Sequence, residues 1–132
     1  MRTVLMALAL VAYGAHAAEE GSTPCDNVEN DKQSLACSKF NRDTAETEMK
    51  GALDDLEERT ANQYADHPNQ LEELKAKISA AQALWIKLRD ADCAIYTFNA
   101  DKNSQSYQTT LNDCLAQKSD ERSEYLQSVG ME

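Results

Sequence analysis

The segment Gln82–Cys93, QALWIKLRDADC, decides how this chain folds. It holds the single Trp of the chain, and Gln82, Trp85 and Arg89 are three and four residues apart, so they share one side of a helix. Cys93 extends the same side by four more residues. We therefore expect the Trp to pack against a neighbouring helix and the cysteine to fasten the end of its own helix to a later part of the chain.

Helical spacing of apolar residues appears on both sides of this segment, at the three- and four-residue steps of one helix face. The first stretch comprises Ala45, Met49, Ala52, Leu53, Leu56, Thr60 and Tyr64. The second comprises Leu71, Leu74, Ile78, Ala81, Trp85 and Leu88. Between them, Pro68 cannot continue a helix interior, while Asn69 with Glu72 resembles a capping box at the start of a new helix. Two helices separated by a turn at residues 66–69 are therefore expected.

The C-terminal part predicts a loop and a further helix. Residues Thr97–Ser106, TFNADKNSQS, are polar and rich in turn formers. The inner side of the following helix is expected to carry Tyr107, Leu111, Cys114, Leu115, Arg122, Tyr125 and Val129. A shorter helix is expected at Asp31–Cys37, and the sequence shows no strand-like alternation. The fold class is therefore all-α, a small antiparallel helical bundle of three main helices plus a short N-terminal helix.

The first residues, Met1–Ala17, have the features of an export signal. Arg2 supplies a positive start, Val4–Ala12 is apolar, and residues 15–17 form a small-x-small cleavage pattern. The apolar run is far shorter than the ~20 residues that span a bilayer, which disfavours a retained anchor helix. No cysteine at the cleavage point offers a site for a lipid. We expect one domain, residues 18–132, in the periplasm or outside the cell and without a membrane anchor.

All four cysteines of the chain lie beyond this signal: Cys25, Cys37, Cys93 and Cys114. An even number of cysteines in an oxidising compartment indicates disulfides. Three pairings are possible, and Cys25–Cys37 with Cys93–Cys114 is favoured because each bridge then closes a short segment. Each bridge would stabilise the fold by roughly 3 kcal/mol. Zinc is the alternative, but the close Cys-x-x-Cys pairs typical of zinc sites are absent.

Together these residues resemble the N-terminal domain family of LprI-like lysozyme inhibitors, which are exported bacterial proteins. The matching pattern is Cys25, Cys37, the helical stretch from Ala45, Gln82-x-x-Trp85-x-x-x-Arg89-Asp90-x-x-Cys93, then Cys114, Arg122 and Leu126. The resemblance implies a small disulfide-bonded helical domain that inhibits lysozyme outside the cytoplasm. We expect five of these motif residues, Gln82, Trp85, Arg89, Asp90 and Arg122, to be structural, with direct ligand contact as the alternative. The family's namesake resembles a lipid-anchored protein, and this chain departs from it in lacking a lipobox cysteine.

The charge balance is strongly acidic. The chain has 13 basic and 23 acidic residues, and removal of the signal takes away Arg2 alone, which leaves a net charge of about −11. Animal lysozymes are strongly cationic, so an acidic surface would steer them and speed association. The acidic face is expected on the helix Thr44–Tyr64, at Glu48, Asp54, Asp55, Glu57 and Glu58. The alternative is that these acidic residues only keep the protein soluble.

The polar loop Thr97–Ser106 is the element expected to enter the cleft of a target enzyme. It would be tethered between Cys93 and Cys114 if these pair, and a tethered loop loses less entropy on binding. Lys102 is placed to approach the paired catalytic carboxylates of a glycosidase. Further hydrogen-bonding groups are those of Asn99, Asn103 and Ser104. The alternative is an ordinary polar connection between two helices.

Catalysis fits this sequence poorly. His67 is the one histidine beyond the signal, too few for a histidine metal site, and neither a Gly-x-Ser-x-Gly turn nor a phosphate-binding Gly-rich loop is present. The negative net charge disfavours nucleic acid as a partner. We therefore expect no enzyme, no cofactor and no metal. Two functions stay open: inhibition of a lysozyme or related cell-wall hydrolase by protein–protein binding, or an envelope structural, stress or interaction module without a hydrolase target.

Overall fold

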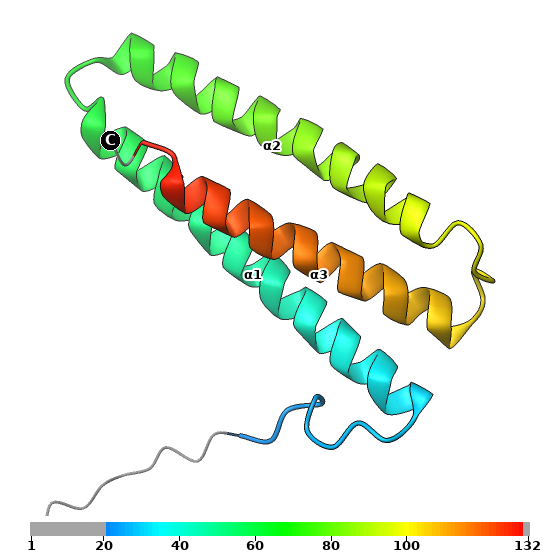
Figure 1. Ribbon diagram of the computed structural model, residues 1–132. Helices are drawn as coiled ribbons and strands as arrows, with labels where there is room; N and C mark the ends of the chain where they lie inside the picture. Colours follow the sequence, from blue (N-terminus) through cyan, green and yellow to red (C-terminus); the bar gives the residue numbers. More distant parts are fainter. Residues whose placement is uncertain (1–20, 131–132) are drawn as a thin grey trace, which may run out of the picture.

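The computed structural model describes residues 21–130, which form three helices in an up-down-up arrangement. The helices are α1 at Asp31–Gln63, α2 at Pro68–Tyr96 and α3 at Gln105–Ser128. Figure 1 shows α1 and α3 side by side along most of their length, with α2 standing further away. The predicted all-α antiparallel bundle is confirmed. The expected signal, residues 1–17, lies outside the described residues.

Residues 31–37 are helical, as expected, but they are the first part of α1 and not a separate helix. The residues between the two expected segments contain neither Gly nor Pro, so nothing in the backbone interrupts the helix. Ser38 is buried and its Oγ accepts a hydrogen bond from Asn112 on α3 at 3.2 Å. At the start of α1 the side chain of Asn30 caps the helix by accepting from the backbone N–H of Gln33. The result is one helix of 33 residues.

Small side chains fill the contact between α1 and α3. The buried residues of α1 are Ser38, Ala45, Ala52, Leu56 and Thr60, so the stripe predicted for this helix from Ala45 onward faces the core. The buried residues of α3 are Asn112, Cys114, Ala116, Ser119, Ser123 and Leu126. Opposite the alanines of α1, α3 places its own short side chains, which lets the two backbones approach closely. Leu126, only 1% exposed, closes the apolar cluster with Ala52 and Leu56.

The inner side predicted for α3 is therefore wrong in part. Cys114 is buried as expected, but Tyr125 is exposed, and Tyr107, Leu111, Leu115, Arg122 and Val129 are only half-buried. Large side chains would hold the two helices apart, so they lie beside the contact while Ser119 and Ser123 occupy its centre. Apolar periodicity misses this face because its residues are small and partly polar.

The buried face of α2 also departs from the predicted stripe. Leu71, Leu74 and Ile78 are half-buried as expected, but Ala81 and Leu88 are exposed. Strict alternation of three- and four-residue steps has a period of 3.5 residues, whereas a straight α-helix has 3.6 residues per turn. Residues with this spacing therefore turn gradually away from the face on which the stripe begins. Beyond Ile78 the inward positions accordingly move to Gln82, Trp85, Arg89 and Cys93.

The turn between α1 and α2 lies where it was expected, but the helix starts earlier. His67 is the N-cap residue of α2, it makes no side-chain capping bond, and Pro68 occupies the first turn. Proline suits this position because its missing N–H would have no partner there. The capping box expected at Asn69 and Glu72 is therefore wrong, since both residues lie inside the helix.

Both predicted disulfides are confirmed. Cys25 is bonded to Cys37, which ties the irregular segment before α1 to the first turns of that helix. Cys93 is bonded to Cys114, which ties the end of α2 to α3. Cys93 is fully buried at this junction. The second bridge therefore holds the least closely packed helix against the pair formed by α1 and α3.

Loss of the two bridges should have unequal effects. Cys93→Ser with Cys114→Ser should lower the free energy of unfolding by about 3 kcal/mol, because the bridge restricts the unfolded chain while both of its ends are fixed in the fold. Cys25→Ser with Cys37→Ser should lower it by less than half as much, since the freed N-terminal segment gains mobility in the folded state too. Urea unfolding followed by circular dichroism measures both values. Equal losses would contradict this account of the second bridge.

Candidate functional site

Two guanidinium groups from different helices contact the ring of Trp85. The Cζ atom of Arg89 on α2 is 5.3 Å from the ring centroid, and that of Arg122 on α3 is 5.5 Å away. Arg122 also lies over the ring of Tyr125, and its Nε donates to Gln82 Oε1 at 3.0 Å. Partial burial lowers the pKa of Arg122. These contacts join α2 to α3 through long side chains.

The same residues reach α1. Arg89 pairs with Glu46 on α1 at 3.2 Å and with Asp90 at 2.8 Å. The Nε2 atom of Gln82 lies 3.5 Å from the sulfur of Met49. The five motif residues therefore gather where the three helices meet, and most of their polar groups are occupied by other parts of the chain. This arrangement favours a structural role over direct contact with a ligand.

The acidic residues predicted on α1 divide into two groups. Glu48 and Asp55 are two helical turns apart and lie on the same side of the helix. Asp54 lies elsewhere and is paired with Lys50 at 2.8 Å. Glu58 is four residues beyond Asp54 and shares that second side of the helix. The structure therefore does not gather Glu48, Asp54, Asp55 and Glu58 into one patch.

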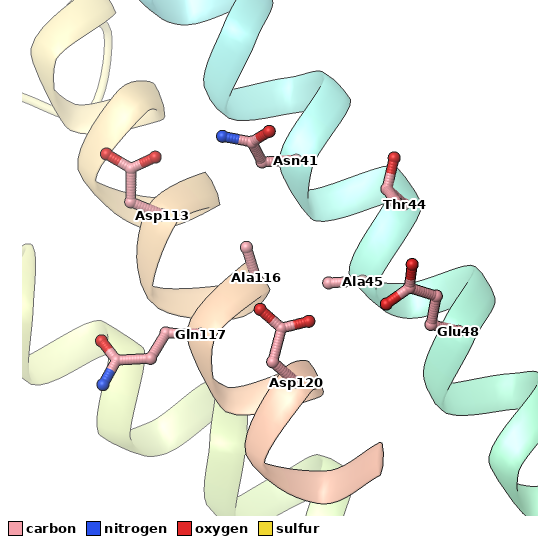
Figure 2. Close-up of a pocket in the computed structure, with 8 residues that line it drawn as sticks. All are labelled: Asn41, Thr44, Ala45, Glu48, Asp113, Ala116, Gln117 and Asp120. Carbon is pink, nitrogen blue, oxygen red and sulfur yellow. The ribbon is translucent and has the colours of Figure 1, made fainter. Parts of the chain in front are cut away.

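Glu48 instead lines an acidic groove between α1 and α3. The groove has a volume of about 400 Å³, and its lining residues are Asn41, Thr44, Ala45, Glu48, Asp113, Ala116, Gln117 and Asp120. Figure 2 shows Ala45 and Ala116 facing one another between the helices, with Glu48 on α1 and Asp120 on α3 to either side. No lining residue comes from α2. The groove therefore exists because short residues at its floor leave the carboxylates standing above it.

Carboxylates continue along both walls of this groove. Asp55 follows Glu48 by two turns, and Glu124 follows Asp120 by one, so each continues its row. Ion pairs are absent at these carboxylates within residues 21–130: none is formed by Glu48, Asp55, Asp113, Asp120 or Glu124. Loss of hydration raises the pKa of Asp113, although part of the residue stays exposed. The acidic groove is therefore lined by the carboxylates of Glu48, Asp113 and Asp120, and Asp55 and Glu124 extend its two rows.

The contribution of α3 to this groove was missed in the sequence. Asp113, Asp120 and Glu124 follow one another at seven and four residues, which is helical spacing on one face. That spacing could have been read from the sequence. Their position opposite Glu48 could not, because it depends on how α3 lies against α1.

The loop between α2 and α3 is folded into turns. Backbone bonds run from Phe98 N to Ile95 O, from Ala100 N to Thr97 O and from Ser104 N to Asp101 O. Ser104 caps α3, because its Oγ accepts from Tyr107 N at 3.0 Å and donates to Asp101 O at 2.7 Å. The predicted contact role of Ser104 therefore competes with a structural one. Asn99, Lys102 and Asn103 are exposed.

This loop is separated from most of the predicted acidic residues. Figure 1 shows it at the end of the bundle where α1 begins, whereas Glu58 belongs to the last turns of α1 at the other end. Two exposed aromatic side chains, Tyr96 just before the loop and Phe98 within it, were missed as candidate contacts. No group of three or more metal-ligating side chains occurs within residues 21–130. In the same part of the chain, no helix is long and apolar enough to cross a membrane.

Replacement of Arg122 by lysine tests the interhelical contact at Trp85. Arg122→Lys should lower the free energy of unfolding by about 1–2 kcal/mol, since a lysine cannot stack on two rings while donating to Gln82. Trp85 is the only tryptophan, so its fluorescence reports the transition directly. Arg59→Lys is the control, because Arg59 donates one bond, to Leu126 O, which a lysine can also make. Equal losses in both variants would assign Arg122 no special role.

Asp113 should make stability depend on pH. The pKa of Asp113 is raised in the folded state, so its carboxyl contributes to stability while it is protonated. This contribution is complete at a pH below 3.8, the pKa in the unfolded chain, and it is lost as the pH rises through the pKa in the folded chain. Asp113→Asn should therefore be more stable than the wild-type chain at pH 7, with no difference at pH 3. Asp66→Asn removes one charge from the turn outside the groove and corrects for net charge. A constant difference between the variants at both pH values would contradict the effect.

Comparison with known proteins agrees with this architecture. The family model described as lysozyme inhibitor LprI matches residues 25–126. A crystal structure of a DUF1311 family protein from Pseudomonas putida KT2440 is 44% identical, covers 80% of this chain and 99% of its own, and superposes with a TM-score of 0.71. A search of curated proteins finds no match. The chain therefore belongs to the lysozyme inhibitor LprI family.

Proposed function

We propose that this protein inhibits a cationic lysozyme, or a related cell-wall hydrolase, by binding it outside the cytoplasm after removal of residues 1–17. The family match over residues 25–126 supports inhibition in general. The two disulfides suit an oxidising compartment. The acidic groove is the observation on this chain that carries the proposal, because its carboxylates form no ion pair with any residue of the described range 21–130.

The groove suits a lysine or arginine side chain of the target. Its floor is formed by the methyl groups of Ala45 and Ala116, on which an aliphatic stem can lie. The charged head then meets Glu48 on one wall and Asp120 on the other, in charge-assisted hydrogen bonds. Such a contact is specific for basic side chains. This contact would strengthen the complex with a basic enzyme, while the net charge of about −11 would speed its formation.

Blocking of the catalytic cleft is assigned to the loop between Cys93 and Cys114. The disulfide and the internal turns restrict this loop before binding, which reduces the entropy lost on association. Lys102 and Asn99 are exposed on it. Lys102→Ala with Asn99→Ala should weaken inhibition while leaving Ser104, the cap of α3, intact. Unchanged inhibition by this variant would remove the loop from the proposal.

A lysis assay tests the function itself. The oxidised chain lacking residues 1–17 is titrated into chicken-type lysozyme acting on bacterial cell walls, at several salt concentrations. Stoichiometric loss of lysis that weakens as salt rises is the expected result, because attraction between opposite net charges is screened. No inhibition of several lysozyme types would favour the alternative, an envelope structural, stress or interaction module without a hydrolase target.

The groove is tested by a matched pair of variants that each remove three negative charges. Glu48→Gln with Asp113→Asn and Asp120→Asn should raise the concentration needed for half-inhibition about tenfold or more, since about 1.4 kcal/mol of binding energy corresponds to each factor of ten. The control carries Glu57→Gln, Asp66→Asn and Glu72→Gln, which are exposed residues outside the groove. It should lose only the smaller effect of net charge. Equal losses in both variants would show that total charge, and not the groove, binds the target.

A further inference from the structure

The outer side of α2 carries a row of exposed apolar side chains. Leu84 is 66% exposed, Leu88 59%, Ile95 74%, and Phe98, two residues beyond the end of the helix, 82%. Ala81 and Ala91 fill the remaining positions and are also exposed. The six residues follow one another at steps of three, four, three, four and three. We call this row the α2 seam.

The seam is distinct from the face by which α2 contacts the rest of the protein. The inward positions Gln82, Trp85, Arg89 and Cys93 are buried or half-buried. The seam positions differ from them by about a third of a turn around the helix, so no residue of α1 or α3 covers them. Single exposed apolar residues are ordinary, but a contiguous apolar row along a helix marks a surface that another molecule covers.

Alternating steps of three and four residues are the spacing by which two helices pack in a coiled coil. A second copy of this chain presents the same seam, and a two-fold axis brings identical surfaces together. We propose that two copies associate through their α2 seams in antiparallel orientation. This inference is independent of the proposed inhibition of lysozyme.

Antiparallel pairing gives layers of complementary size. With the axis between Leu88 and Ala91, each Leu88 packs on Ala91 of the second copy. Leu84 then lies opposite Ile95, and Ala81 lies opposite Phe98. A parallel pair would instead oppose alanine to alanine in two layers and leave gaps, which loses contact energy. Antiparallel helices also place their dipoles favourably.

Area and charge set the strength of this association. The seam is about 25 Å long and would bury on the order of 500 Å² per copy, less than the roughly 800 Å² per partner of a stable interface. The dimer should therefore be weak and transient. Helix α2 has four acidic and four basic residues, so these acidic molecules meet along a helix whose own charges balance.

Sedimentation equilibrium of the oxidised chain lacking residues 1–17, from about 10 µM to about 1 mM, tests the proposal. A monomer–dimer equilibrium is expected that tightens as salt rises, because salt screens the repulsion between two acidic copies. Leu84→Glu should weaken the dimer about tenfold or more. Ala83→Glu adds the same charge at the neighbouring exposed position, off the seam, and should dimerise as the wild-type chain does.

The orientation has its own test. Leu84→Glu combined with Ile95→Lys should restore association, since antiparallel packing sets each new carboxylate against a new ammonium of the other copy. In a parallel dimer like charges would face each other, so a monomeric double variant overturns the orientation. Circular dichroism checks that the helix is retained. A wild-type chain that stays monomeric up to about 1 mM, or that binds neutral phosphatidylcholine vesicles instead, overturns the proposal.

Discussion

The close contact of α1 with α3 is the constraint from which the other features of this protein follow. Ala45, Ala52, Ala116, Ser119 and Ser123 fill that contact, and their short side chains bring the helices together without a large apolar core. Hydrogen bonds also cross it: Asn112 accepts from Arg42 and donates to Ser38. Because the contact is narrow, the charged residues beside it stand along its open side, and the acidic groove is the result.

The third helix is held in a different way. α2 meets the other helices through long side chains around Trp85 and through the Cys93–Cys114 bridge, and not through a broad apolar face. An arginine network needs particular partners, so it fixes the rotation of α2 about its own axis. That rotation decides which apolar residues turn outward. The α2 seam is therefore a consequence of how the helix is anchored.

Features that depend on local spacing could be predicted from the sequence. Which helix face is buried could not, because small differences in packing decide it. Helical periodicity located the elements, and cysteine spacing located both bridges. The inner side of α3 was missed because serine and alanine carry little hydrophobic signal, although Ser119 is fully buried. Leu88 was assigned to the core because the apolar residues of α2 repeat every 3.5 positions, whereas the helix has 3.6 residues per turn. The groove needed α3 to be placed against α1, which periodicity alone does not give.

The two proposed surfaces lie on different helices and respond to salt in opposite directions. The groove belongs to α1 and α3, with no residue from α2, whereas the seam belongs to α2 and the residue just beyond it. A dimer formed through α2 would therefore leave both acidic grooves accessible. Where target molecules are crowded on a surface, a dimer bound through one groove holds its second groove close to another target molecule. The second binding event then takes place at a high effective concentration. Lysozyme bound to a cell wall is such a target, so a weak dimer would strengthen inhibition there more than in free solution.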